Sequence, residues 1–272
     1  MDRGMAMRTI MMFGAAVLAA GPATAQEKLR EFCADRPGLG TPACTVDKGH
    51  LQVELGLGDW TLDKQADSRT DTILAGDVSL RYGIGDTTEL RLGWTGYGHV
   101  RVRDRATGVA DRTSGMGDVT VGIKQNLAHP DGDGFSIALL PFATLPTGRN
   151  QVGAGDWGAG LLVPVTYALN RTFTLELTPE IDAAVDEDGN GRHLAYGGVV
   201  GLQAKLGEKA GIAAELQATR DRDPDQHATM TTAGLSFAYQ PQGQSQFDIG
   251  VNAGLNHEAP DLEVYFGVSR KF

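Results

Sequence analysis

The amino-acid sequence predicts an all-β protein, a transmembrane antiparallel up-and-down β-barrel of about 12 strands with a short disulfide-stapled N-terminal segment. Three observations predict this fold. Apolar and polar residues alternate with a period of two from residue 50 to Phe272. Turn residues interrupt that alternation about every ten positions, and Gly alone accounts for 37 residues. The only long apolar run, from Ile10 to Ala20, lies near the N-terminus.

That apolar run predicts an export signal. It follows Arg3 and Arg8 and precedes Ala23-Thr24-Ala25. A basic start, a short apolar core and an Ala-x-Ala end are typical of a cleaved secretory signal peptide, and the run is about half as long as a membrane-spanning helix. We therefore predict a signal peptide over residues 1–25, with export to the outer membrane of a Gram-negative bacterium.

Residues 26–49 lack strand periodicity and contain both cysteines, Cys33 and Cys44. Export permits a disulfide between them, with free thiols as the alternative. A metal site here is disfavoured because no His lies between the two cysteines. We expect a small stapled segment that lies in the periplasm or plugs the barrel, which we assign to residues 50–272.

The alternation assigns one face of each strand to the barrel lumen. It is clearest where Phe173, Leu175 and Leu177 alternate with Thr174, Glu176 and Thr178. Apolar side chains would face lipid and polar side chains would face water inside. The predicted lumen-lining residues are Glu54, Asp77, Arg81, Glu89, Arg91, Asp118, Lys124, Glu176, Glu180, Lys205, Glu215, Asp248 and Glu263.

Aromatic residues gather on the apolar faces, mostly near strand ends. Membrane girdles form there because aromatic rings straddle the apolar and wet layers. The predicted girdle consists of Tyr82, Trp94, Phe135, Trp157, Tyr167, Phe173, Tyr239, Phe247 and Phe272. Phe272 also ends the last amphipathic strand, which resembles the signal that barrel-assembly machinery recognises.

The predicted connections alternate in length. Residues 83–87 and 168–172 form tight turns, whereas residues 98–114 and 145–156 form longer loops. Short periplasmic turns and longer outer loops are typical of this topology.

The excess of acidic over basic residues limits the kinds of molecule that the protein can bind. The formal net charge of −10 argues against nucleic acid. The expected partners are outer-membrane lipid, a small-molecule solute and, during biogenesis, the barrel-assembly machinery.

No residue pattern predicts catalysis, a cofactor or a metal site. The polar-face serines have no paired His, and paired carboxylates are more simply explained as lumen lining. His99, His193, His227 and His257 fall near the outer end, where we expect solvated loop side chains, with a transition-metal site as the alternative; no two of them share an i, i+2 spacing on one face. Residues 186–191 match half of a calcium loop, but Gly197 replaces the twelfth-position acid. We expect a polar turn, with weak calcium binding as the alternative.

The stretch from Cys33 to Trp60 carries Asp35-Arg36-Pro37-Gly38, Thr41-Pro42, Cys44-Thr45-Val46-Asp47 and Val53-Glu54-Leu55-Gly56. Further on are Gly115-Met116-Gly117-Asp118-Val119 and a run from Pro141 to Gly148. These motifs resemble the outer-membrane transporter family labelled "MetA-pathway of phenol degradation". The resemblance implies a barrel and uptake of aromatic or other hydrophobic compounds.

The leading functional prediction is a channel, not an enzyme, for passive passage of small, aromatic or hydrophobic solutes. Leu140, Phe142, Leu162 and Tyr265 fall on the interior face, where they would form an apolar patch for such a solute, or a local plug. The first alternative is a structural or binding barrel plugged by its N-terminal segment. The second is an outer-membrane hydrolase or acyltransferase.

Overall fold

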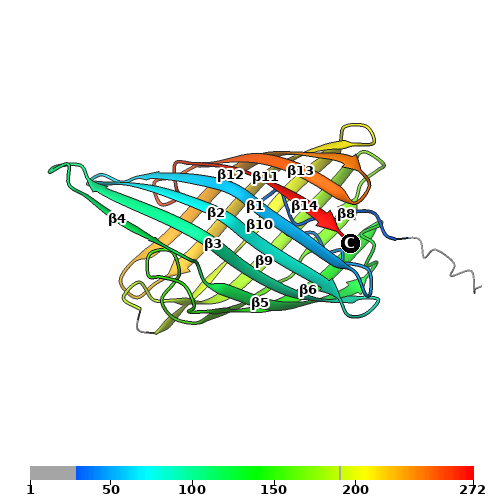
Figure 1. The fold of residues 1–272 in the computed structure, drawn as a ribbon, viewed down its shortest axis with the longest axis horizontal. Helices are drawn as coiled ribbons and strands as arrows, with labels where there is room; N and C mark the ends of the chain where they lie inside the picture. The colour runs from blue at the N-terminus through cyan, green and yellow to red at the C-terminus, as the bar shows by residue number, and fades with distance from the viewer. Residues whose placement is uncertain (1–28, 190) are drawn as a thin grey trace, which may run out of the picture.

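The computed structural model describes residues 29–189 and 191–272, and these residues form one closed antiparallel β-barrel (Figure 1). The predicted signal peptide, residues 1–25, lies outside the described residues. Among the described residues, no helix is long and apolar enough to cross a membrane.

The β-strands follow one another along the chain and pair mainly with their sequence neighbours. Their bounds are β1 Leu51–Lys64, β2 Ser68–Gly83, β3 Thr88–Asp104, β4 Ala110–Gly115, β5 Val119–Ala128, β6 Phe135–Leu145, β7 Gly158–Leu162, β8 Val165–Ala168, β9 Phe173–Val185, β10 Arg192–Lys205, β11 Ala210–Arg222, β12 His227–Gln242, β13 Ser245–Gly254 and β14 Leu262–Lys271.

These fourteen segments build a barrel of 12 strands, as predicted. β4 and β5 both pair with β3 and form one wall strand. β7 and β8 both pair with β6 and β9, and they are separated only by Val163 and Pro164. The barrel closes where β1 pairs with β14, for example at Leu55 and Val268.

One predicted loop is wrong. Residues 98–114 form a hairpin, because β3 continues to Asp104 and β4 begins at Ala110. Val100 and Val102 alternate with Arg101 and Arg103, so a strand signal was present, but the charged and Gly-containing residues that follow, from Asp104 to Gly108, favoured a loop. The hairpin projects from the barrel at the end opposite the C-terminus (Figure 1). We call the end that holds Phe272 the periplasmic end and the hairpin end the outer end.

The barrel buries charge and exposes apolar side chains. On β9, Leu177 and Ile181 are 44% and 50% exposed, whereas Glu54, Arg81 and Lys124 are fully buried. A water-soluble domain has the reverse arrangement. Lipid is therefore the solvent that the outer surface requires.

Candidate functional site

Residues 29–49, the inner segment, cross the interior of the barrel. Within this segment the amide of Asp35 donates to Glu54 of β1, that of Thr41 to Thr178 of β9, and that of Leu39 to Glu215 of β11. β9 and β11 flank β10, whereas β1 lies on another part of the wall, four strands from β11 and farther from β9. The inner segment therefore spans the lumen.

Wall glutamates hold the backbone of the inner segment. Glu54 accepts from the amides of Asp35 and Arg36, each at 3.0 Å. Glu215 accepts from the amides of Leu39 and Gly40, each at 2.9 Å. Glu89 likewise accepts from the Val46 amide at 2.8 Å. An irregular buried backbone needs such acceptors, and a carboxylate makes the stronger kind of hydrogen bond.

Gly40 permits the close approach of the inner segment to the wall. A Cβ atom at Gly40 would lie 2.2 Å from Oε1 of Glu176 and 3.3 Å from Oε1 of Glu215. No side chain fits there without displacing Glu176.

Arg81 of β2 joins the wall to the inner segment. On the wall side its guanidinium donates to Glu89 at 2.9 Å and to Glu54 at 3.0 Å. On the inner side it donates to the Asp35 carboxylate and the Cys33 carbonyl, both at 3.0 Å. Its side chain is fully buried. One cation thus satisfies carboxylates from two strands and from the inner segment.

Two further cations extend this network. Nζ of Lys124 donates to the carbonyls of Pro42 at 3.0 Å and Cys44 at 3.3 Å. Arg91 forms an ion pair with Asp35. The buried cations therefore neutralise the acids of both the wall and the inner segment.

A second attachment lies near the periplasmic rim. Nζ of Lys271 donates to Asp47 at 2.8 Å and to the Arg30 carbonyl at 3.0 Å. Burial favours the neutral form of Asp47, but hydrogen bonds from Lys271 and from the Arg30 amide, and their positive charges, hold the pKa of its carboxyl below the usual value. On β13, Asp248 accepts from Arg36 at 3.0 Å.

The predicted disulfide between Cys33 and Cys44 is confirmed. It closes the inner segment into a loop whose two ends both face Arg81, through the carbonyls of Cys33 and Cys44. Asp35 and Arg36, which lie inside this loop, belong to a family motif in the sequence but were not among the predicted site residues. Charge within a Gly- and Pro-rich stretch was the available signal.

The structure brings together only some of the residues predicted to line the lumen. Glu54, Arg81, Glu89, Arg91 and Lys124 meet in one network. Glu176 on β9 and Glu215 on β11 lie across the lumen beside Gly40, whereas Asp248 on β13 lies two strands from β1. Four acids lie nearer the outer end: Asp77, Asp118, Glu180 and Glu263. Lys205 lies at the periplasmic rim with its side chain 62% exposed, 3.3 Å from Glu31.

The nine predicted girdle aromatics are all exposed. Seven lie toward the periplasmic end: Tyr82, Phe135, Tyr167, Phe173, Tyr239, Phe247 and Phe272. Trp94 lies midway along β3, because that strand continues into the outer hairpin. Trp157 lies just before β7, beneath the guanidinium of Arg192 at 4.3 Å.

The prediction of solvated outer histidines is wrong for His193, whose side chain is only 6% exposed. It lies among carboxylates from the connections that follow β9 and β11.

A cavity of about 220 Å³ lies inside the barrel, beside Thr41 of the inner segment. Leu140, Phe142 and Leu162 form an apolar side of it, and Ser79 and Thr120 add polar groups. Tyr265, the fourth residue of the predicted apolar patch, lies elsewhere, beneath the guanidinium of Arg36 at 5.4 Å. The alternation therefore placed three of these four side chains around one cavity.

A groove of about 680 Å³ lies beside this cavity on the outside of the barrel wall, the face that would contact lipid. Mostly apolar residues line it, including Leu80, Leu90 and Ile123. Four residues line both the groove and the inner cavity: Arg91, Leu92, Gly122 and Phe142. The two spaces thus meet across the wall.

The ladder between β5 and β6 is interrupted at this point. Its pairs run from Val119 with Leu145 to Gly122 with Phe142, and they resume at Gln125 with Leu139. Pro141 lies in the interruption and has no amide proton to donate. Gly122 adds no side chain, so the wall is thin where the two spaces meet.

A third cavity, of about 630 Å³, lies at the periplasmic end. Residues of the inner segment, including Phe32 and Pro37, form one side, and residues of β10 to β12, including Ile212 and Ser236, form the other. The inner segment therefore narrows the lumen without filling it completely.

The family described as "Putative MetA-pathway of phenol degradation" matches residues 34–272. No curated protein matches the chain.

Solved structures share the fold at low sequence identity. The COG4313 outer membrane channel from Pseudomonas putida F1 is 17% identical with a TM-score of 0.68, covering 87% of this chain and 99% of that one. The NanC porin is 10% identical with a TM-score of 0.53, covering 82% and 100%. The translocator domain of the autotransporter NalP from Neisseria meningitidis is 16% identical with a TM-score of 0.52, covering 83% and 89%. The fold is thus that of outer-membrane β-barrels with different roles.

Proposed function

The chain belongs to the family described by the phenol-degradation label, and on that premise we propose that it is an outer-membrane channel for small apolar solutes, aromatic compounds included. The family description supports the substrate class. The COG4313 channel from Pseudomonas putida F1, which has the same fold, supports the channel role.

The observation that carries the proposal is the junction between the inner cavity and the outer groove. Apolar side chains line most of the groove and about half of the inner cavity, and Phe142 borders both. An aromatic ring offers an apolar solute a surface to stack on at low entropic cost. This route does not favour a polar solute, because the groove at its end opens toward lipid, where polar groups lose their hydrogen bonds to water.

The position of the inner segment favours exit through the barrel wall over passage along the barrel axis to the periplasmic end. Below the cavity, the straight path to the periplasm meets the disulfide loop and the buried ion network of Arg81. Above the cavity, Asp77 is exposed and Glu180 is partly exposed, and such acids support a wet entrance at the outer end. A solute would enter from outside, reach Phe142 and leave through the wall.

The experiment is an uptake assay in cells that lack their own aromatic channels and keep an intact lipopolysaccharide layer. Production of this chain should raise the initial uptake rate of labelled toluene and leave that of labelled arabinose unchanged. Faster uptake of arabinose without faster uptake of toluene would contradict the apolar route.

A plugged barrel that only binds its solute is the second candidate. The hydrogen bonds from the inner segment to β1, β9 and β11 favour it. Toluene that binds the purified protein at one site but enters cells no faster would favour this candidate over the channel.

A further inference from the structure

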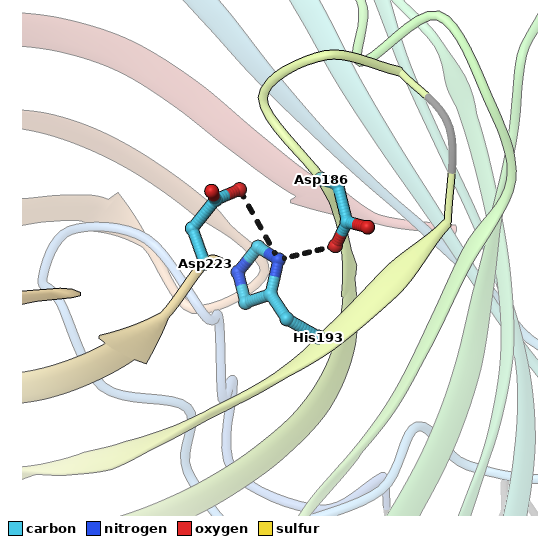
Figure 2. Close-up of side chains that lie close together, drawn as sticks. All are labelled: Asp186, His193 and Asp223. Atoms are coloured by element: carbon cyan, nitrogen blue, oxygen red, sulfur yellow. Dashed lines mark hydrogen bonds and ion pairs between the residues drawn. The ribbon is translucent and has the colours of Figure 1, made fainter. Parts of the chain in front are cut away.

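A histidine and two aspartates from separate strands converge at the outer end of the barrel (Figure 2). His193 lies at the start of β10, Asp186 directly after β9, and Asp223 directly after β11. The three side chains point toward one another. The group is therefore assembled by the barrel and not by one stretch of sequence.

The spacing of the ligand atoms suits a small cation. Nδ1 of His193 lies 2.9 Å from Oδ1 of Asp186 and 3.4 Å from Oδ2 of Asp223. Ligands about 2.0–2.2 Å from a zinc ion are separated from one another by roughly 3.0–3.5 Å. The 3.4 Å distance falls within this range. The 2.9 Å distance is that of a hydrogen bond between His193 and Asp186, and a slight separation of these two side chains would admit an ion in place of the shared proton.

Backbone hydrogen bonds hold the carboxylate of Asp223 in place. Its Oδ2 atom accepts from the amide of Glu187 at 2.7 Å, and its Oδ1 atom accepts from the amide of Asp225 at 2.8 Å. The first of these bonds reaches across from the connection after β9. The carboxylate is therefore oriented before any ligand binds.

The other ring nitrogen of His193 provides a second, independent observation. The side chain is only 6% exposed, and Nε2 is buried without a hydrogen bond of good geometry, although Oδ1 of Asp221 lies 2.8 Å away. Metal-bound histidines commonly face a carboxylate with the nitrogen that does not bind the metal. Asp221 is positioned for that role once Nδ1 is engaged.

The neighbouring guanidinium groups face other partners. Arg192 pairs with Asp156 at 2.9 Å, Arg220 donates to Thr229 at 2.7 Å, and Arg222 lies 5.4 Å from the Tyr196 ring. Three carboxylates around one imidazole thus leave a concentration of negative charge. A divalent cation would reduce it.

We propose that Asp186, His193 and Asp223 bind a divalent first-row transition metal ion such as Zn²⁺, with Asp221 orienting the imidazole. One nitrogen and two carboxylate ligands suit this class of ion, whereas Ca²⁺ prefers six to eight oxygen ligands. The ion would tie the connection after β9 to the connection after β11. The site is independent of the apolar route near Phe142.

The test measures Zn²⁺ binding to the tag-free full-length protein, refolded in detergent, by equilibrium dialysis and elemental analysis. The wild type should bind one Zn²⁺ per chain. His193→Ala should lose this binding, and Asp221→Asn should weaken it about 10- to 100-fold. His99→Ala is the matched control, because His99 also lies near the outer end but bonds to Ser114. It should bind Zn²⁺ as the wild type does.

Two further measurements separate lost binding from lost folding. Heat-modifiable gel mobility reports whether each variant forms the barrel, and Asp223→Asn replaces His193→Ala if the latter does not. Cu²⁺ bound in the same site should show nitrogen coupling from one imidazole in its electron paramagnetic resonance spectrum. Absence of Zn²⁺ binding by the wild type, or undiminished binding by folded His193→Ala, would overturn the proposal.

Discussion

The Nη1 atom of Arg81 lies 3.0 Å from Oδ1 of Asp35, and this contact joins the barrel wall to the inner segment. The same atom also lies 3.0 Å from Oε1 of Glu54. The buried guanidinium thus links a carboxylate of the inner segment, Asp35, to a carboxylate of the wall, Glu54. Removal of one partner from such a group costs much more than the net value of any single pair, because the remaining charges stay buried.

Arg81→Met should therefore lower the free energy of unfolding by about 3–5 kcal/mol. The substitution preserves an unbranched side chain but leaves Glu54 and Glu89 without the cation that lies between them. The measurement is urea unfolding in lipid vesicles, followed by tryptophan fluorescence.

Arg112→Met is the control for the Arg81 variant, because Arg112 is exposed on the outer hairpin. It should change stability by less than about 1 kcal/mol. Equal losses for the two variants would show that the buried network contributes nothing specific.

Reduction of the Cys33–Cys44 disulfide should loosen the inner segment and raise the ionic conductance of the barrel. A disulfide of this kind typically stabilises the ordered state by about 2–4 kcal/mol. Planar-bilayer recordings before and after a reductant test this, with thiol titration to verify reduction. The double variant Cys33→Ser/Cys44→Ser should have the conductance of the reduced wild type from the start, and the reductant should not change it. An unchanged conductance in fully reduced wild type would contradict the expectation.

Gly122→Val should slow the entry of toluene while leaving ionic conductance unchanged. A Cβ atom at Gly122 would already lie 3.2 Å from Leu140 and 3.2 Å from the Pro141 carbonyl, so a branched side chain would fill the junction between the cavity and the groove. Gly211→Val, on the far wall beside the periplasmic cavity, is the control. If both variants admit toluene equally fast, the wall junction is not the route.

Leu177→Arg should cost about 2–4 kcal/mol of stability, because it places a charge on the lipid face of β9. Glu180→Arg on the same strand faces the wet lumen and should cost less than about 1 kcal/mol. Unfolding in vesicles measures both. A larger loss for Glu180→Arg would reverse the assigned faces of the strand.

The alternation in the sequence predicted the faces of the strands well, since it depends only on the pleat. It placed Arg81 inside the barrel but could not identify its partners. Asp35 and the Cys33 carbonyl lie 46 and 48 residues away in the chain. Periodicity carries no information about which distant groups meet.

The faces themselves shift where a strand carries a bulge. In β1 the register with β14 changes between Gly56 and Gly58, and beyond it Asp59 and Tyr265 form a pair. One inserted residue reverses the faces that follow it. A single sequence offers no mark of such an insertion beyond the glycines.

Strand pairing, and not the spacing of residues along the chain, brings Asp186, His193 and Asp223 together. Along the chain, no second histidine has a suitable spacing from His193. Its contacts Asp186 and Asp223 are delivered by the strands on either side of β10. Such convergence depends on strand register, which the pattern of apolar residues does not specify at a polar rim.

The most direct test of the account is the single-channel conductance of the protein that lacks residues 29–48, compared with that of the full chain. Arg81 keeps Glu54 and Glu89 as partners in the shortened protein, so the barrel should still fold, as heat-modifiable gel mobility would show. We predict a small conductance for the full chain and a much larger, stable conductance for the shortened one. Equal conductances from two folded barrels would contradict the conclusion that the inner segment narrows the lumen.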